Sequence, residues 1–229
     1  MMKNLKPTQQ RQAGLSLVEM MIGLVLGLVV ISAVFNTYLG TSRSSRFSEG
    51  LQVMQENGRY GITTLQRGIR LAGYNPEGDL DPVDIANSNA STIVVRQTDL
   101  YDCNGQSTAT VGGVAVNSYS HDQATETITC TGNVNPTAMP VVEGVERMRI
   151  LWGIDANNDD VPEQYIPYDA GIDAGQVVAM RIAILVNSGD DIRTRAGEET
   201  HVLLDEEYLT NDKIARHVFS STVLLRNRR

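Results

Sequence analysis

A single glutamate interrupts a long apolar run near the start of the chain. Glu19 lies in the stretch QAGLSLVEMMIGLVLGLVV, residues 12–30. A carboxylate inside a membrane-grade helix costs on the order of 2.5–3.5 kcal/mol near the bilayer centre, and it is usually paired there. The chemistry of this stretch therefore depends on which positive charge Glu19 meets, and on the elements that bring the two together.

The run around Glu19 is long enough to cross a membrane. Residues 15–39 are apolar apart from a few polar side chains, and a helix of this length reaches about 37 Å. A bilayer core is about 30 Å thick. Lys3, Lys6 and Arg11 precede the run, in a leader without acidic residues. By the positive-inside rule, we expect the leader to stay in the cytoplasm and the long C-terminal part to be exported.

The order of the leader differs from that of a secretory signal, in which cleavage after the apolar run removes it. Here Ala13 and Gly14 precede the run, and Glu19 is the fifth residue beyond Gly14. Cleavage after Gly14 keeps the helix on the mature protein and creates an α-amino group on Leu15, which is largely cationic at neutral pH. We expect Glu19 to neutralise this group on an incoming subunit, in apolar surroundings that strengthen the attraction. The alternative is an interfacial glutamate that reaches the lipid headgroups.

The segment AGLSLVEMMIGLVLG resembles the class III signal of type IV prepilins. In that family, prepilin peptidase cuts after the glycine and methylates the new amino terminus. The resemblance implies cleavage after Gly14, N-methylation of Leu15 and an assembly role for Glu19. Phenylalanine is the usual first residue of the mature protein, so Leu15 departs from the commonest pattern.

Two later segments look like the PilW family of minor pilins from type IV pilus systems. They are VEGVERMRILWGIDANNDDVPEQY, residues 142–165, and the ending VFSSTVLLRNRR. The resemblance implies a minor pilin that primes or caps the fibre with other minor pilins and the major pilin. It also implies storage in the inner membrane as a single-pass protein with a periplasmic C-terminal domain, followed by incorporation into the pilus.

Two other functions are compatible with the same N-terminal signal and apolar helix. One is a minor pseudopilin of a type II secretion system, of the GspJ-like kind. The other is a pilus-tip adhesin that uses the helix as a mount and the loops around Cys103 and Cys130 as its binding face. The identity of the binding partners distinguishes a pseudopilin from a pilus protein better than the sequence does.

The rest of the chain predicts an α+β, pilin-like fold. Apolar residues at spacings of three and four continue from Phe47 to Ala72, which indicates one face of a helix. Glycines within it predict a bend or an interruption, and the sequence GYNP from Gly73 ends it. We expect four parts: a leader (1–14), a transmembrane half-helix (15–39), an amphipathic half-helix (40–73) and a globular domain (74–229).

The globular domain contains runs rich in β-branched residues, which predict strands of an antiparallel sheet packed on the amphipathic half-helix. We expect Trp152, on one of these runs, to lie in the core. The expected strands are residues 92–98, 109–116, 126–130, 145–154, 177–187, 200–206 and 217–227.

Two cysteines, Cys103 and Cys130, lie far beyond the apolar run. In an exported domain they can form a disulfide, and closing a loop of this length stabilises a fold by roughly 3–4 kcal/mol. The alternative is two separate buried thiols.

The sequence DANNDD places Asp155, Asn157 and Asp159 at alternating positions that could turn oxygens toward one Ca²⁺. Asp160 and Ile166 stand where a calcium loop requires glycine and glutamate, so the pattern is incomplete. A turn held by side-chain to backbone hydrogen bonds explains the same residues. We expect no other cofactor.

Charge and motif content exclude two classes of function. Without the leader the chain has 16 basic and 27 acidic residues, a net charge of −11, which argues against a nucleic-acid-binding surface. The three histidines have no metal-ligand spacing, and no hydrolase, metalloprotease or phosphate-loop motif is present. We therefore expect no enzyme activity, histidines at the surface of strands or loops, and a solvated arginine-rich tail.

Overall fold

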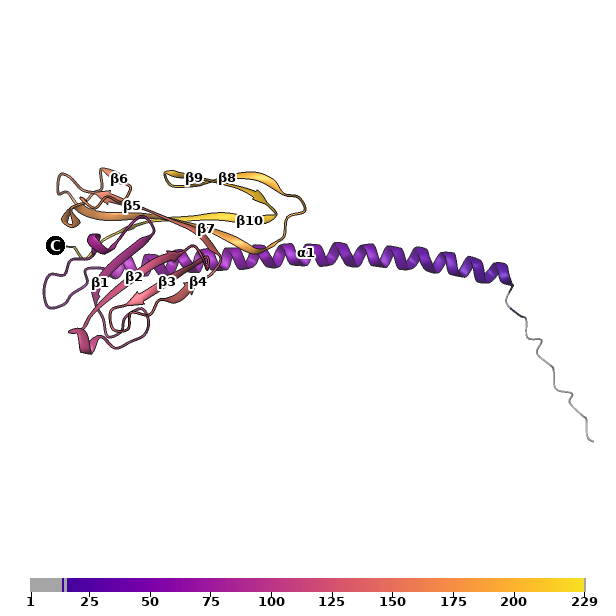
Figure 1. Cartoon of the computed structure of the whole chain (residues 1–229), viewed down its shortest axis with the longest axis horizontal. Coiled ribbons are helices and arrows are strands. Elements are labelled where there is room, and N and C mark those ends of the chain that lie inside the picture. The colour runs from indigo at the N-terminus through magenta and orange to yellow at the C-terminus, as the bar shows by residue number, and fades with distance from the viewer. Residues whose placement is uncertain (1–13, 15, 229) are drawn as a thin grey trace, which may run out of the picture. The chain divides into compact units, whose positions relative to one another are not determined.

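The computed structural model describes Gly14 and residues 16–228 (Figure 1). Residues 1–13 of the expected leader, and Leu15, the expected methylation site, lie outside the described residues. The chain divides into two compact units, Met1–Ser45 and Arg46–Arg229. The first consists, where described, of the start of one helix, and the second contains the rest of that helix and every strand.

The helix α1 runs without a break from Leu17 to Leu71. The expected interruption at its glycines is therefore wrong. The helix ends just before the predicted position, where Gly73 takes a left-handed backbone conformation with φ of +80°. Glycine adopts this conformation without the steric penalty that a side chain imposes.

Two four-stranded antiparallel sheets form the second unit, and the α+β prediction is confirmed. The first sheet has the order β1-β2-β3-β4 and the second has the order β10-β7-β5-β6. The strands of the first sheet are β1 (Thr92–Thr98), β2 (Val114–Asp122), β3 (Thr127–Gly132) and β4 (Met139–Val142). Those of the second are β5 (Val145–Ile154), β6 (Gln164–Ile166), β7 (Val177–Asp191) and β10 (Ile214–Leu224).

A separate hairpin covers part of the outer face of the second sheet. It consists of β8 (Gly197–Leu203) and β9 (Glu206–Asp212) (Figure 1). Leu203 packs with Leu185 of β7, and Arg149 of β5 donates two hydrogen bonds to the Asp205 carboxylate, at 2.8 and 2.6 Å. This cover helps to explain why residues 177–186 of β7 are apolar on both faces apart from Arg181.

Glycines let the C-terminal part of α1 approach the sheets closely. A Cβ at Gly58 would lie 2.1 Å from the Phe219 ring of β10, and one at Gly68 would lie 2.8 Å from the Tyr119 ring of β2. The aromatic rings thus occupy the space that larger helix residues would fill. We expected these glycines to weaken the helix. In the structure they form a packing surface for the aromatic rings.

The predicted core face is largely confirmed. Met54, Leu65 and Ile69 are buried, and Trp152 is fully buried in the main core. Phe47 is the exception, since 43% of its surface is exposed.

The predicted strands agree best where the run is long and apolar. The bounds of β1 and β5 match, whereas residues 108–111 form a 3₁₀-helix instead of the expected strand start. The short strands β4 and β6, and the polar strand β9, were not expected. The remaining 3₁₀-helices are Ile85–Asn87 and Ala174–Gln176.

Candidate assembly site

The expected cleavage site lies in exposed chain just before α1. Gly14 is exposed and not helical, and a Cβ placed on it would have no atom within 4 Å. The first helical turn closes with a hydrogen bond from the Met20 N–H to the Ser16 carbonyl at 3.1 Å. Among the described residues, none packs against Gly14.

Glu19 lies in the first turn of α1 and is exposed. A carboxylate at this end of a helix is favoured by the helix dipole. Among the described residues, none forms an ion pair or a side-chain hydrogen bond with it. Its neighbours Val18 and Met20 are apolar and 61% and 67% exposed. The structure thus presents one carboxylate, without an internal partner, on an apolar helical surface.

The apolar surface continues beyond Glu19 to Leu39. Within α1, this stretch is long and apolar enough to cross a membrane, and its side chains are not covered by the fold. An uncovered apolar helix needs either lipid or other helices around it. This requirement places Glu19 at the edge of a surface that must be buried by something outside the chain.

Cys103 and Cys130 form a disulfide, with their Cα atoms 6.3 Å apart. The bond ties the loop after β1 to β3, where Cys130 is fully buried. Asp102 holds the same loop by accepting hydrogen bonds from the backbone N–H groups of Asn104 and Gln106, at 3.0 and 2.9 Å. The disulfide and these hydrogen bonds therefore hold the loop against the first sheet.

The acidic turn after β5 is a hydrogen-bonded turn. Asp155 is fully buried, and its carboxylate accepts backbone N–H hydrogen bonds from each residue from 157 to 160. Burial opposes ionisation of Asp155, but these four donors outweigh it and lower the pKa of its carboxyl. Arg228 adds a positive charge, since its Nη2 lies 3.3 Å from Asp155 Oδ2 and also contacts Asp160.

Two of the predicted calcium ligands lie in an acidic cluster whose oxygens already accept hydrogen bonds. Carboxylate oxygens of Asp155, Asp159 and Glu163 lie within 4.8 Å of one another, so an acidic cluster exists. However, both Asp155 oxygens already accept hydrogen bonds, and Glu163 accepts one from the Ala156 N–H at 2.8 Å. Asn157 donates its side-chain amide to Asp159 at 3.2 Å. Hydrogen bonds and Arg228 therefore hold the turn in the conformation described.

Arg228 and Glu163 are residues whose roles the sequence did not show. The arginine-rich tail is not a solvated extension where it is described. The Arg228 side chain is only 15% exposed, and Asn227 donates its side-chain amide to the carbonyls of Arg70 and Ala72, at 3.1 and 3.2 Å. The tail joins the end of α1 to the acidic turn.

The histidines also differ from expectation, since two of them are partly buried. His121 donates a hydrogen bond to the Val145 carbonyl at 2.8 Å, and His201 lies 3.2 Å from the Thr210 hydroxyl. Burial lowers the pKa of both imidazoles and outweighs the groups that favour their charged forms. Among the described residues no histidine joins a group with metal-ligand geometry.

Comparison with known proteins decides the family. The family of type IV pilus-assembly protein W, PilW, matches residues 114–227, and the prokaryotic N-terminal methylation motif matches residues 9–35. The chain is a type IV pilin-like protein with a PilW domain. The methylation motif includes Gly14, Leu15 and Glu19, so the resemblance to the prepilin signal and to PilW is confirmed.

One solved structure adds a distant likeness. A type IV-like pilin from Thermus thermophilus has 15% sequence identity, with coverage of 76% of this chain and 98% of that chain, and a TM-score of 0.44. No curated protein matches the sequence. The PilW domain belongs to a structural family, and the described residues give no positive evidence of catalysis.

Proposed function

We propose that this PilW-domain protein is a minor pilin, and that its assembly depends on a charge pair made by Glu19. Prepilin peptidase cleaves after Gly14 and methylates Leu15. The new amino group of one subunit then meets Glu19 of another inside the fibre. The observation that carries this proposal is the exposed Glu19 carboxylate, which has no partner among the described residues and lies on an uncovered apolar helix.

The electrostatics give the pair both strength and selectivity. Two opposite charges attract more strongly in apolar surroundings than in water, and an unpaired charge left there is costly. A subunit that docks out of register leaves both charges unpaired. The pair therefore selects one axial position among the many that a uniformly apolar helix permits.

The proposal assigns each part of the chain a task. Residues 1–14 are the leader, residues 15–39 span the inner membrane, and residues 40–73 continue as the amphipathic half-helix. Residues 74–229 form the periplasmic domain, which joins other minor pilins and the major pilin. The complex primes or caps the fibre, and this subunit leaves the membrane when it enters the pilus.

The PilW domain favours a pilus over a type II secretion pseudopilin. Deletion of the gene tests the choice in cells that have both systems. We expect loss of surface pili with normal secretion, and recovery of pili with the wild-type chain. Normal pili together with a secretion defect would contradict the proposal. A Gly14→Val chain, which the peptidase should not process, is the negative control, and it should not restore the pili.

A further inference from the structure

A group of basic residues surrounds a cavity at the end of the second unit where the chain enters it. Arg46 and Phe47 lie on α1, and the loop between β7 and β8 supplies Arg193 and Arg195. Phe47 and residues 192–195 line a cavity of about 320 Å³. We call Arg46, Phe47, Arg193, Arg195 and Lys213 the entry patch.

The fold holds these segments together. A Cβ at Gly50 would lie 2.9 Å from Cγ2 of Ile192, so the loop is packed directly on α1. The Arg193 N–H donates a hydrogen bond to the Lys213 carbonyl at 2.9 Å, which brings the connection between β9 and β10 to the same place. The patch is therefore built from three separate segments by close packing.

The charges of the entry patch are arranged in layers. Arg46, Arg195 and Lys213 are exposed, and no described residue pairs with their side chains. Arg193 is 26% exposed and pairs with Glu199 at 2.8 Å. Acidic residues are also close in sequence, namely Glu49, Asp190, Asp191 and Glu198.

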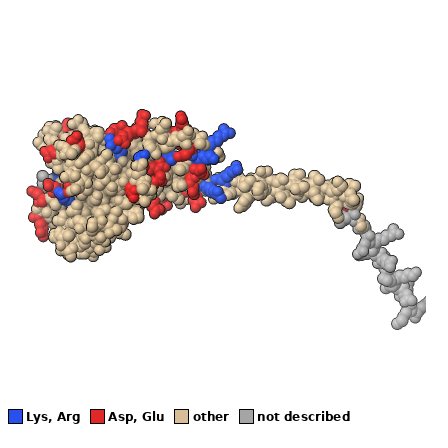
Figure 2. Space-filling model, viewed as in Figure 1, with Lys and Arg blue, Asp and Glu red and all other residues tan. Residues whose placement is uncertain are grey.

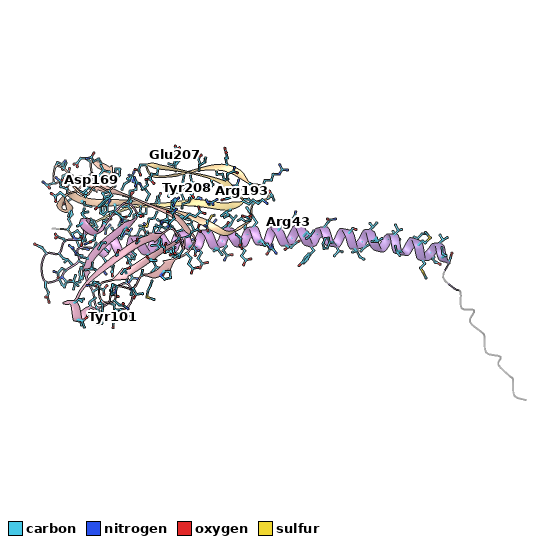
Figure 3. All side chains as sticks on the ribbon, in the orientation of Figure 1. Arg43, Tyr101, Asp169, Arg193, Glu207 and Tyr208 are labelled. Atoms are coloured by element: carbon cyan, nitrogen blue, oxygen red, sulfur yellow. A yellow bond between two sulfur atoms is a disulfide. The ribbon has the colours of Figure 1, made fainter. Side chains whose placement is uncertain are left out.

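The figures show how the two signs are distributed. In Figure 2, blue side chains lie at the extreme end of the unit where the chain enters, and red ones follow behind them. Figure 3 places Arg193 at this end. A flat anionic surface that approaches this end meets the basic layer first. Because the field of such a surface falls off over about 8 Å at physiological salt, the outermost charges dominate the interaction.

Chain length indicates which anionic surface this is. Arg46 follows Leu39, the last residue of the apolar stretch, by seven residues, which is about 10 Å of α-helix. The headgroup layer on each side of a bilayer adds roughly 5–8 Å to the hydrocarbon core. An α1 that spans a membrane with residues 15–39 therefore places Arg46 close to the lipid phosphates.

We propose that the entry patch binds the phosphate groups of anionic phospholipids at the surface of the membrane that holds α1. The guanidinium groups pair with phosphate oxygens in a forked geometry. The Phe47 ring, which is 43% exposed, lines the cavity beside these groups. This inference rests on the proposed membrane storage, and it adds a contact that must break when the subunit leaves for the fibre.

The test uses the full-length protein in nanodiscs made of phosphatidylcholine alone or with 30% phosphatidylglycerol. Thr194→Cys carries a fluorescent label, and headgroup-attached spin labels on the lipid quench it on contact. The native disulfide leaves no other thiol for labelling. A label at Val161→Cys, in the turn between β5 and β6, reports on the opposite end of the unit.

We expect stronger quenching at position 194 in the anionic discs, and none of this increase at position 161. Neutralisation of Arg195 and Lys213 to Gln should reduce the equilibrium constant for contact about fivefold for each charge removed. Arg226→Gln, which removes an exposed arginine elsewhere, should leave the quenching unchanged. Salt at 0.5 M should weaken the contact, and 10 mM inorganic phosphate should not.

Equal quenching in both disc types, or quenching unaffected by the double variant, would overturn the inference. Competition by free phosphate would also overturn it, since the patch would then be a site for the soluble ion. The proposed function is tested separately in the same sample. A chain that fails to co-elute with the discs contradicts membrane storage itself, whereas a chain that inserts without the anion effect contradicts the lipid contact alone.

Discussion

Glu19 differs from the other carboxylates of α1 in its place on the apolar part of the helix. It is flanked by the exposed apolar residues Val18 and Met20, whereas Glu49 and Glu56 lie in the second unit. Glutamate at the first turn of a helix is common and needs no explanation in water. In a helix covered by lipid or by other subunits, we propose that the amino group of a neighbouring subunit supplies the cation that pairs with it.

Replacing Glu19 with Ala should leave processing intact and prevent efficient assembly. The incoming amino group then has no partner in apolar surroundings, so we expect about a tenfold or larger loss of the subunit from the fibre. The measurement is the ratio of the protein in sheared pili to the processed protein in membranes. Glu49→Ala is the matched control. Equal recovery of the Glu19 and Glu49 variants in pili would rule out the charge pair.

Arg228 has a structural role that can be separated from that of its neighbour. Arg228→Ala removes the cation from the buried Asp155 carboxylate and should lower the urea midpoint of unfolding. Arg226→Ala changes an exposed side chain and should stay within about 0.5 kcal/mol of wild type. Because the chain has one tryptophan, Trp152, which is fully buried, its fluorescence reports on the unfolding of this unit. Identical midpoints for the two variants would contradict the role of Arg228.

Residue-level prediction succeeded where the signal was local. The prepilin pattern around Gly14 and Glu19 is contiguous, and the methylation motif that contains it is confirmed, whereas cleavage after Gly14 and the role of Glu19 stay predictions. The disulfide between Cys103 and Cys130, predicted from the expectation of export, is present. The acidic turn was open to two explanations because its partner, Arg228, lies 73 residues from Asp155 in the sequence. No local pattern indicates such a contact.

At the scale of elements, the close packing of α1 gives a direct test. Gly58→Ala gains helix propensity of about 1 kcal/mol but forces a Cβ into the Phe219 ring. Overpacking costs about 1–3 kcal/mol, so we expect a net loss of stability of up to about 2 kcal/mol. Gly40→Ala has no atom within 4 Å of the new Cβ and should not lower stability.

Denaturation followed by Trp152 fluorescence in detergent measures both glycine variants. Adding Phe219→Leu to Gly58→Ala should recover part of the loss, since the smaller side chain vacates the space. A Gly58→Ala protein as stable as Gly40→Ala would show that the close approach to Phe219 is not required.

Element prediction followed the strength of the pattern. The long apolar runs of β5 and β7 and the helical spacing of α1 are readable from the sequence. The strands β4, β6 and β9 are short or polar, and they exist because neighbouring strands offer hydrogen bonds to their edges. The prediction at the glycines of α1 was wrong because helix propensity disfavours glycine. In this fold, close packing against the sheets requires residues without a Cβ atom.

At the scale of the whole molecule, the stability of the folded unit should depend on pH through two histidines. His121 and His201 have pKa values below their ordinary value of 6.5, mainly because of burial. The unfolded chain therefore takes up protons at a higher pH than the folded chain. Stability is retained above about pH 6.5 and falls as the pH decreases from there.

Urea denaturation between pH 7.5 and 5 measures this effect. Wild type should lose stability across the range, and the double variant His121→Gln with His201→Gln should lose less. Some carboxyls have lowered pKa values, such as that of Asp205 beside Arg149. Their protonation destabilises the fold only at a lower pH than this range. A wild-type midpoint that rises on acidification to pH 5 would contradict the assignment.

The account depends most on how the mature chain begins. Intact-mass analysis and amino-terminal sequencing of the protein extracted from membranes decide this directly. We expect a polypeptide that starts with N-methylated Leu15 and retains the apolar half of α1. A protein that still starts at Met1, or one that has lost residues 15–39, would contradict the proposed charge pair, because Glu19 would then have no new amino group to meet.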